Sequence, residues 1–312
     1  MKTNSPNTVS RIILNVSKYA LLCIIIACGS EGGQTNEDEG FDSLMEEETV
    51  APENKLDEAF LTEIIQRIPS PVELVALLKA SGAEYSEAML NPTENTEKYT
   101  TSSKQALNLG IYGADLGYIN MYEKTISSLS YLNAVKQMAD LIKVGQFFDF
   151  NTLKRLSSNT ENVDSLLYIT TSNFNKMDAY LREQGRSDLS ILSVAGAWLE
   201  GIYIASQIAK KTNNEEIIER IGEHKMALND ITLILSQYAH DENIAKTAED
   251  FKRIQAAFAD VQVNITEAEP EMQEVEGKLV IIDKSSSEII ISKETLANII
   301  IVVNEVRNSC IN

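Results

Sequence analysis

The chain has few of the residues that most often carry catalysis or hold metal ions. Its 312 residues include three cysteines and two histidines. The signatures of serine hydrolases, dinucleotide-binding folds, phosphate-binding loops, zinc proteases and carboxylate-bridged metal bundles (GxSxG, GxGxxG, GxxxxGK[ST], HExxH and ExxH) are all missing from the sequence. We therefore expect no cofactor and no motif-defined active site, and the sequence leaves any metal unassigned.

Basic residues are scarce as well. Lysine and arginine number 27 against 46 aspartates and glutamates, which gives a formal net charge of −19 at pH 7. Such a charge repels a phosphate backbone and argues against nucleic acid as a partner. It also repels a bare anionic membrane surface, so membrane attachment would need a covalent or apolar anchor.

The amino terminus has an apolar stretch that is too short to span a membrane. Tyr19–Ala27 (YALLCIIIA) contains nine residues, whereas a transmembrane helix takes about 20. The stretch ends in Ile25-Ile26-Ala27-Cys28, in the order aliphatic, aliphatic, small, cysteine. This segment resembles the lipobox of bacterial lipoproteins.

The resemblance covers residues 1 to about 30 and implies a membrane anchor. It implies a signal peptide over residues 1–27 and an acylated Cys28 that attaches the mature chain to a lipid bilayer of the bacterial cell envelope. Gly29 and Ser30 follow without the aspartate that in some bacteria retains lipoproteins at the inner membrane. The outer membrane is therefore expected, with its periplasmic or surface side left open. An ordinary cleaved signal peptide and an uncleaved anchor are the alternatives.

The remaining cysteines agree with this interpretation. Cys23 lies in the segment that would be removed, and Cys310 stands alone near the carboxyl end. No internal disulfide is then expected in the mature chain. A lone terminal thiol without a histidine nearby in the sequence is also a weak candidate for a nucleophile.

Residues 28–54 are predicted to be the lipidated cysteine and an acidic, disordered tether. The segment is rich in glycine and acids and shows no apolar period. A flexible coil of this length reaches on the order of 28 Å, enough to hold a domain clear of the lipid headgroups. The acidic runs 37–39 and 46–48 fit a solvated spacer, with calcium binding as the alternative.

Residues 55–312 are predicted to form one all-α domain, a bundle of long antiparallel helices with a small β-hairpin near the carboxyl end. No linker divides this range. Apolar residues at helical spacing, with capping residues and glycine stops, predict helices over approximately 55–67, 72–80, 101–145, 163–184, 187–211, 215–238, 242–265 and 293–308. A break near Thr125 within the range 101–145 is left open. Residues 278–283 and 288–292 are expected to pair as the hairpin.

Two stretches stand out within these helices, Leu107–Tyr122 (LNLGIYGADLGYINMY) and Gly196–Tyr203 (GAWLEGIY). Glycine inside a helix costs about 1 kcal/mol relative to alanine, so several glycines require a compensating gain such as close helix packing. On a helical wheel the first helix has a stripe of small residues at Gly110, Gly113, Ala114, Gly117 and Met121. The stripe predicted to meet it consists of Ala197, Gly201, Ile204, Ala205 and Ile208.

The adjoining faces of the same two helices carry the candidate ligand-binding residues. These are Tyr112, Asp115, Tyr118 and Tyr122 on the first helix, and Glu200 and Tyr203 on the second. A buried Asp115 needs hydrogen bonds or a cation, because an unpaired buried carboxylate is very costly. The two acids either have structural or solvated roles or converge on a polar or cationic ligand. Their mutual geometry decides between these alternatives.

The two histidines give little functional information. His224 lies in a seam between Ile221 and Leu228, which predicts a buried imidazole, with a ligand or proton-relay role as the alternative. His240 is expected to be partly exposed at a helix end. The sequence thus predicts an envelope lipoprotein acting as a non-catalytic interaction or structural module that docks another envelope protein. The alternative is a ligand-binding or sensor-like domain with an interhelical pocket around Asp115 and Glu200.

Overall fold

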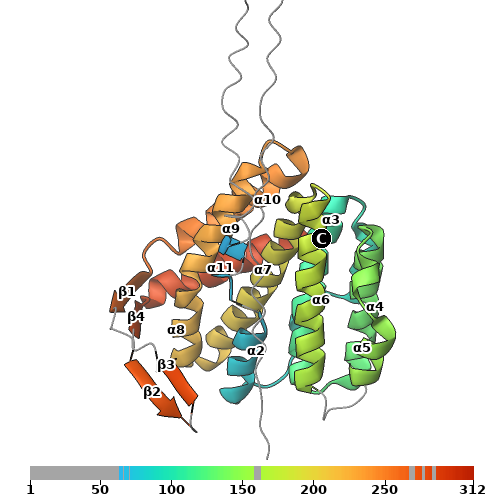
Figure 1. The fold of residues 1–312 in the computed structure, drawn as a ribbon. Coiled ribbons are helices and arrows are strands. Elements are labelled where there is room, and N and C mark those ends of the chain that lie inside the picture. Colours follow the sequence, from blue (N-terminus) through green and yellow to red (C-terminus); the bar gives the residue numbers. More distant parts are fainter. Residues whose placement is uncertain are drawn as a thin grey trace, which may run out of the picture. The chain divides into compact units, whose positions relative to one another are not determined.

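The computed structural model describes residues 63–65, 67–69, 71–157, 163–266, 271–275, 278–282 and 286–312 (Figure 1). The predicted signal peptide, the lipobox at Cys28 and the tether lie outside the described residues. Residues 54–312 form one compact unit. The predicted all-α bundle with a small β-hairpin is confirmed.

The described helices and strands follow one another in a simple order. The α-helices are α2 (Pro71–Ala80), α3 (Ser102–Met121), α4 (Thr125–Leu141), α5 (Phe150–Ser157), α6 (Val163–Glu183), α7 (Ser187–Thr212), α8 (Glu215–Glu223), α9 (Lys225–Gln237), α10 (Glu242–Ala257) and α11 (Lys293–Ile311). Short 3-10 helices are η1 (Glu87–Met89), η2 (Thr93–Lys98) and η3 (Gly145–Phe147). The strands are β1 (Gln262–Thr266), β2 (Glu271–Val275), β3 (Lys278–Ile282) and β4 (Ser286–Ile290).

Helices α3 and α7 form the centre of the domain and share its largest helix–helix interface. Both are apolar or small along most of their length and are buried on nearly all sides. Thr101 caps α3 by accepting a hydrogen bond from the backbone N–H of Lys104, and Asn213 ends α7 in the left-handed conformation. In the described part of the chain, α7 alone is long and apolar enough to cross a membrane. Because 89% of its apolar window is buried in the domain, it is packed as a core helix.

Glycines allow the backbones of α3 and α7 to approach each other closely. A Cβ atom on Gly110 would lie 1.9 Å from the carbonyl oxygen of Ser193, and one on Gly196 would lie 1.9 Å from the carbonyl oxygen of Leu107. The predicted packing role is therefore confirmed for Gly110. The partner stripe was predicted incompletely, because the contact runs over Ser193, Gly196 and Ala197. These residues share one helical stripe at spacings of three and four.

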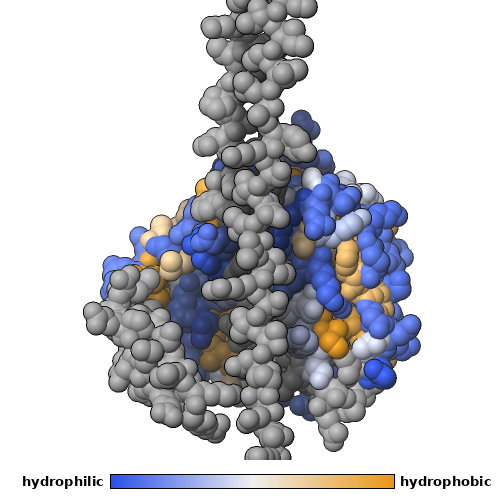
Figure 2. All heavy atoms as spheres, in the orientation of Figure 1, coloured by the Kyte–Doolittle hydropathy of each residue, from blue (hydrophilic) through white to orange (hydrophobic). Residues whose placement is uncertain are grey.

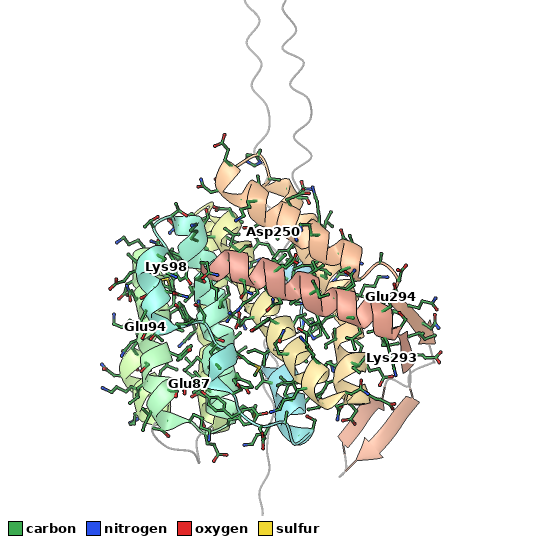
Figure 3. All side chains as sticks on the ribbon, turned by 180° about the vertical axis from the view of Figure 1, so that it is seen from behind. Glu87, Glu94, Lys98, Asp250, Lys293 and Glu294 are labelled. Carbon is green, nitrogen blue, oxygen red and sulfur yellow. The ribbon has the colours of Figure 1, made fainter. Side chains whose placement is uncertain are left out.

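Helix α11 crosses the back of the domain and packs against α7, α10 and α3 (Figure 3). The side chain of Ser292 caps it by accepting a hydrogen bond from the backbone N–H of Thr295. Its buried side chains are Ile299, Ile300, Val303, Val306, Arg307 and Ile311. The predicted closing helix is confirmed, and it brings one arginine into the core.

Some predicted boundaries were wrong. The helix expected over 215–238 is divided into α8 and α9 at His224, and α10 ends at Ala257. The break that the sequence left open near Thr125 is present, because α3 ends at Met121 and α4 begins at Thr125. The spacing of Phe258, Val261 and Ile265 fits a helix, so the sequence predicted that α10 extends to Ile265. In the structure Ile265 lies in β1. Short apolar segments do not distinguish the two periods.

The predicted strand segments exist, but they do not pair with each other. Strand β3 pairs antiparallel with β2, with Glu271 opposite Ile282, and β4 pairs antiparallel with β1, with Gln262 opposite Ile290. The hairpin is therefore β2–β3, and β1 and β4 flank it in sequence. Strands β1 and β4 lie next to α8.

Candidate functional site

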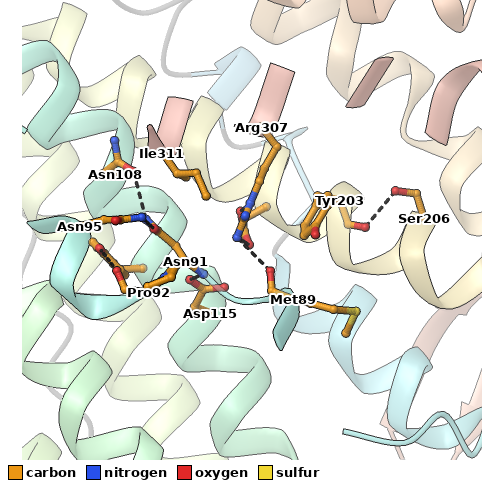
Figure 4. Close-up of polar contacts among 12 residues, drawn as sticks. Met89, Asn91, Pro92, Asn95, Asn108, Asp115, Tyr203, Ser206, Arg307 and Ile311 are labelled. Atoms are coloured by element: carbon orange, nitrogen blue, oxygen red, sulfur yellow. Dashed lines mark hydrogen bonds and ion pairs between the residues drawn. The ribbon is translucent and has the colours of Figure 1, made fainter. Parts of the chain in front are cut away.

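The centre of the domain contains a buried ion pair between Glu200 of α7 and Arg307 of α11. The Nε of Arg307 donates to one carboxylate oxygen at 2.9 Å, and its Nη2 donates to the other at 2.7 Å. Nη2 also donates to the carbonyl oxygen of Met89 at 2.9 Å, and the guanidinium lies 4.4 Å from the centre of the Tyr203 ring (Figure 4). The exposed fraction of the side chain is 0% for Glu200 and 4% for Arg307. The pair is fully removed from solvent and has several hydrogen bonds.

Asp115 of α3 joins this pair as a second buried acid. Its Oδ2 accepts a hydrogen bond from the backbone N–H of Asn91 at 3.1 Å, and its carboxyl group is close enough to Glu200 for the two acids to interact electrostatically. Burial, followed by the charge of Glu200, raises the pKa of Asp115 well above its usual range, while Arg307 and the Asn91 N–H act in the opposite direction. The predicted convergence of Asp115 and Glu200 is therefore present.

The charges of this cluster balance when Asp115 is protonated. One guanidinium neutralises one carboxylate, and a second buried carboxylate would have no cation of its own. As a carboxylate, Asp115 leaves its Oδ1 without a donor among the described residues. A protonated carboxylic acid has one O–H donor, so protonation gives Asp115 a donor that it lacks as a carboxylate. The charge balance and the raised pKa of Asp115 both favour a neutral cluster in which Asp115 carries a proton.

The tyrosines of α3 do not point into a ligand site. The segment 83–92, which connects α2 to η2, covers this face of the helix. Each hydroxyl bonds to the backbone of that segment: Tyr112 donates to Pro92 O at 2.9 Å, Tyr118 accepts from Ser86 N at 3.1 Å, and Tyr122 donates to Ala83 O at 2.8 Å. The residues predicted to await a ligand thus hold a segment of their own chain.

Amide side chains extend this network to the end of α11. The side chain of Asn91 donates to Tyr99 and to Asn108, at 3.0 and 3.3 Å. Asn108 donates to the carbonyl oxygen of Cys310 at 3.2 Å, and the Tyr99 hydroxyl donates to that of Ile311 at the same distance. Figure 4 shows Asn91, Asn108 and Ile311 close together beside Asp115. Segment 83–99, α3 and α11 are thereby joined.

Sequence reasoning missed Arg307, which provides the cation that Asp115 and Glu200 require. The residue is separated from Glu200 by 107 positions, so no local pattern connects them. Its own helix contained a signal. Arg307 lies four residues after Val303 and four before Ile311, so it falls on the apolar stripe of an otherwise core-facing helix. A charged residue on such a stripe indicates a buried partner.

A cavity of about 330 Å³ lies on the other face of α3, bounded also by α2, α6 and α7. A Cβ atom on Gly113 would lie 2.9 Å from the Phe174 ring, whereas one on Gly117 would meet nothing within 4 Å. The glycine stripe that packs tightly at Gly110 therefore opens toward Gly117. The lining is Ile65, Ile68, Pro69, Val75, Gly110, Gly113, Ala114, Gly117, Thr171, Phe174, Asn175, Met177, Asp178, Ser190, Ser193, Val194, Ala197 and Trp198.

The histidines are found where the sequence predicted them. His224 is 4% exposed, and burial, with a smaller effect of Arg220, lowers its pKa to about 4. It is therefore a neutral imidazole at pH 7. His240 is exposed at the end of α9, with its Nδ1 3.1 Å from the carbonyl oxygen of Gln237. Within the described ranges no three histidine, cysteine, aspartate or glutamate side chains are placed to hold a metal ion.

Comparison of the chain with models of protein families, with curated proteins and with solved structures gave no match. The function is therefore argued from the chemistry of the two faces of α3.

Proposed function

We propose that the protein is a lipid-anchored, non-catalytic binding module of a bacterial envelope, and that its helical domain holds a small apolar molecule in the cavity beside Gly117. The observation that carries the proposal is that one face of α3 is fully packed and the other borders a cavity. The acidic face is filled by residues of the same chain, and the glycine face borders an open volume of about 330 Å³.

The volume and the lining of the cavity support ligand binding. Small-molecule sites typically have volumes of about 300–1,000 Å³ and are lined mostly by apolar groups with a few polar ones. The side chains of Ile65, Val75, Phe174 and Met177 supply the apolar surface. The sequence suggested a pocket around Asp115 and Glu200, and the proposal moves it to the opposite side of the same helix.

The acid cluster does not support catalysis. Asp115 and Glu200 are both 0% exposed, and a substrate would have to displace segment 83–92 to reach them. Arg307 already uses Nε and Nη2 on Glu200 and Met89. The cluster is therefore assigned to holding α3, α7 and α11 together.

The described surface gives less support to a protein-docking role. Figure 2 shows that the coloured residues on this face are mostly hydrophilic. The larger exposed apolar side chains belong to five different elements: Ile126 and Leu141 in α4, Tyr168 in α6, Met226 and Leu233 in α9, Ile290 in β4, and Ile301 in α11. Docking faces collect such residues in one continuous patch.

Binding can be tested with the single tryptophan of the chain, Trp198, which lines the cavity. Bromobenzene quenches indole fluorescence through its heavy atom and is small enough to enter. We expect saturable quenching in the wild type and in Gly117→Ala, and loss of quenching in Gly117→Leu, whose side chain extends into the cavity. Circular dichroism checks that both variants are folded. Equal quenching of all three proteins, or no saturation in the wild type, would refute the cavity as a binding site.

The anchor requires a separate test. Metabolic labelling with a radioactive fatty acid should mark the wild type and leave Cys28→Ala unlabelled. Cys310→Ala serves as the matched control and should be labelled like the wild type. A label that persists in Cys28→Ala would contradict the lipobox interpretation without affecting the cavity.

A further inference from the structure

The polar groups around the cavity are mostly engaged with one another. Ser190 donates a hydrogen bond to Asp178, which also pairs with Arg182. The hydroxyl of Ser193 donates to the carbonyl oxygen of Ala106 at 3.0 Å. Because the one acid of the lining already has a cation and a hydroxyl donor, the cavity offers no unbalanced charge. A neutral occupant is therefore favoured over an ion.

The indole of Trp198 differs from the side chains of Ser190, Ser193 and Asp178. Its side chain lines the cavity and the residue is 3% exposed, yet its indole Nε1 has no hydrogen-bond acceptor among the described residues. The indole N–H can only donate, and a buried donor without an acceptor is unfavourable. Almost all such groups in folded proteins find a partner in protein, water or ligand.

His224, whose ring lies beside that of Trp198, does not supply the acceptor. The imidazole of His224 lies edge-on to the indole, with 6.4 Å between ring centroids, and its Nδ1 is also without a partner in the described part of the chain. The two rings contact each other without a direct hydrogen bond. A molecule in the adjoining cavity, which the Trp198 side chain lines, can supply the acceptor.

The volume limits the size of that molecule. An engineered apolar cavity of about 150 Å³ binds benzene, and the space beside Gly117 is about twice as large, at about 330 Å³. A ring with a substituent, two fused rings or a short acyl chain fits this volume. The apolar side chains of Ile65, Val75, Phe174 and Met177 would surround its body.

We infer that the cavity takes a small, neutral, mainly apolar molecule with one hydrogen-bond acceptor, and that Trp198 is the specificity-determining donor to that acceptor. The inference rests on the proposed function, because it requires the cavity to bind a ligand. It adds the chemical class of the ligand and the residue that selects it. The Nε1 without an acceptor among the described residues and the place of Trp198 in the lining of the cavity carry the assignment.

Benzonitrile and phenylacetylene form a matched pair of probes. They have nearly the same shape, but only benzonitrile carries a hydrogen-bond acceptor at the end of its triple bond. Isothermal titration calorimetry with the purified protein should show a preference for benzonitrile that falls about fivefold in Trp198→Phe, the value of one typical hydrogen bond. The nitrile stretching band of bound benzonitrile should shift to higher frequency in the wild type and lose that shift in Trp198→Phe.

Each outcome of this experiment decides a different point. If both probes bind and their affinity ratio and the nitrile band are unchanged in Trp198→Phe, the donor role is wrong and the cavity remains a binding site. In that case the Trp198 N–H is satisfied by water near His224. If neither probe binds to the wild type, the proposed function fails. Gly117→Leu should exclude both probes while leaving Trp198 in place, which controls for binding elsewhere.

Discussion

Helix α3 presents two faces that are packed in different ways. On one face, Asp115 and three tyrosines bind the backbone of segment 83–92 and meet the Glu200–Arg307 pair. On the other, Gly110 is in backbone contact with α7, and the stripe then opens into the cavity beside Gly117. Polar side chains in a core form hydrogen bonds or ion pairs with groups from the rest of the chain, because leaving them unpaired is costly. Glycines have no side chain that requires a partner, so the space beside them is filled only where a neighbouring element comes close enough.

The largest effect is expected from removing the cation of the filled face. Arg307→Met keeps an apolar chain of similar length, but it leaves Glu200 as an uncompensated buried charge. Breaking a buried pair in this way costs about 3–5 kcal/mol of the free energy of unfolding, measured by urea denaturation. Adding Glu200→Gln to this variant should restore part of the loss, because the orphaned charge is then removed.

Arg253→Met is the matched control for that prediction. Arg253 pairs with Asp250 and Glu305, and its side chain is 46% exposed. The pair with Glu305 is exposed on both sides, and exposed pairs contribute about 0–1 kcal/mol. Asp250 is more buried, but it keeps a hydrogen bond from Ser309 when Arg253 is replaced. A loss of the same size in both variants would contradict the central role of the Glu200–Arg307 pair.

The next effect compares two glycines seven positions apart on α3. In Gly110→Ala the new methyl group would lie 1.9 Å from a backbone oxygen of α7, so the helices must separate, at a cost of about 1–3 kcal/mol or more. In Gly117→Ala the methyl group meets nothing within 4 Å, and the better helix propensity should stabilise the domain by up to about 1 kcal/mol. Thermal unfolding of the two variants should therefore show midpoints shifted in opposite directions. Midpoints shifted in the same direction would mean that Gly110 and Gly117 are packed alike, which would contradict the open space beside Gly117.

These two glycines also show what the sequence could predict. Glycines within an apolar helix were sufficient to identify α3 and α7 as the central pair, because their cost implies close packing. The sequence did not distinguish Gly110 from Gly117, since the difference lies in what faces each of them. Ser193 of α7 reaches Gly110, whereas no atom of another described element comes within 4 Å of a Cβ placed on Gly117.

The candidate site was predicted in part for a similar reason. The wheel placed Asp115 with its tyrosines on one face, and the requirement for a cation followed from burial. The cation itself, Arg307, is distant in sequence, and Asn91 lies between η1 and η2, where no periodic pattern connects it to Asp115. Long-range pairing in an all-α chain leaves no local pattern, so the partners of buried polar residues had to come from the structure.

A smaller effect is expected when one hydroxyl of the filled face is removed. Tyr112 is fully buried, and Tyr112→Phe leaves the carbonyl oxygen of Pro92 without its 2.9 Å hydrogen bond. The expected loss is about 1–2 kcal/mol. Hydrogen exchange should also accelerate in segment 83–92, while α4 stays protected. Tyr168→Phe is the control, because Tyr168 is 76% exposed and its replacement should change neither measurement.

The smallest change in the free energy of unfolding near pH 4 is expected from replacing Asp115. The pH dependence of that change tests whether Asp115 carries a proton in the folded state. The pKa of Asp115 is raised in the folded state. Above about pH 4 the carboxyl group of Asp115 therefore loses its proton in the unfolded chain but keeps it in the folded protein. The folded state then binds more protons, so this group lowers the free energy of unfolding as pH rises, by at most about 1.4 kcal/mol per pH unit, until the folded-state pKa is passed.

Asp115→Asn supplies an N–H donor in place of the acid proton and cannot titrate. Near pH 4 its stability should lie within about 1 kcal/mol of the wild type, because the amide can donate a hydrogen bond as the protonated acid does. As pH rises to 7, the variant should become the more stable of the two, since only the wild type carries the proton-linked penalty. If Asp115 is ionised and stabilising, as in an ordinary ion pair with Arg307, the variant must instead be less stable at pH 7 and approach the wild type in acid. Urea denaturation of both proteins from pH 4 to 7 therefore distinguishes a face with a protonated Asp115 from one held by two charges.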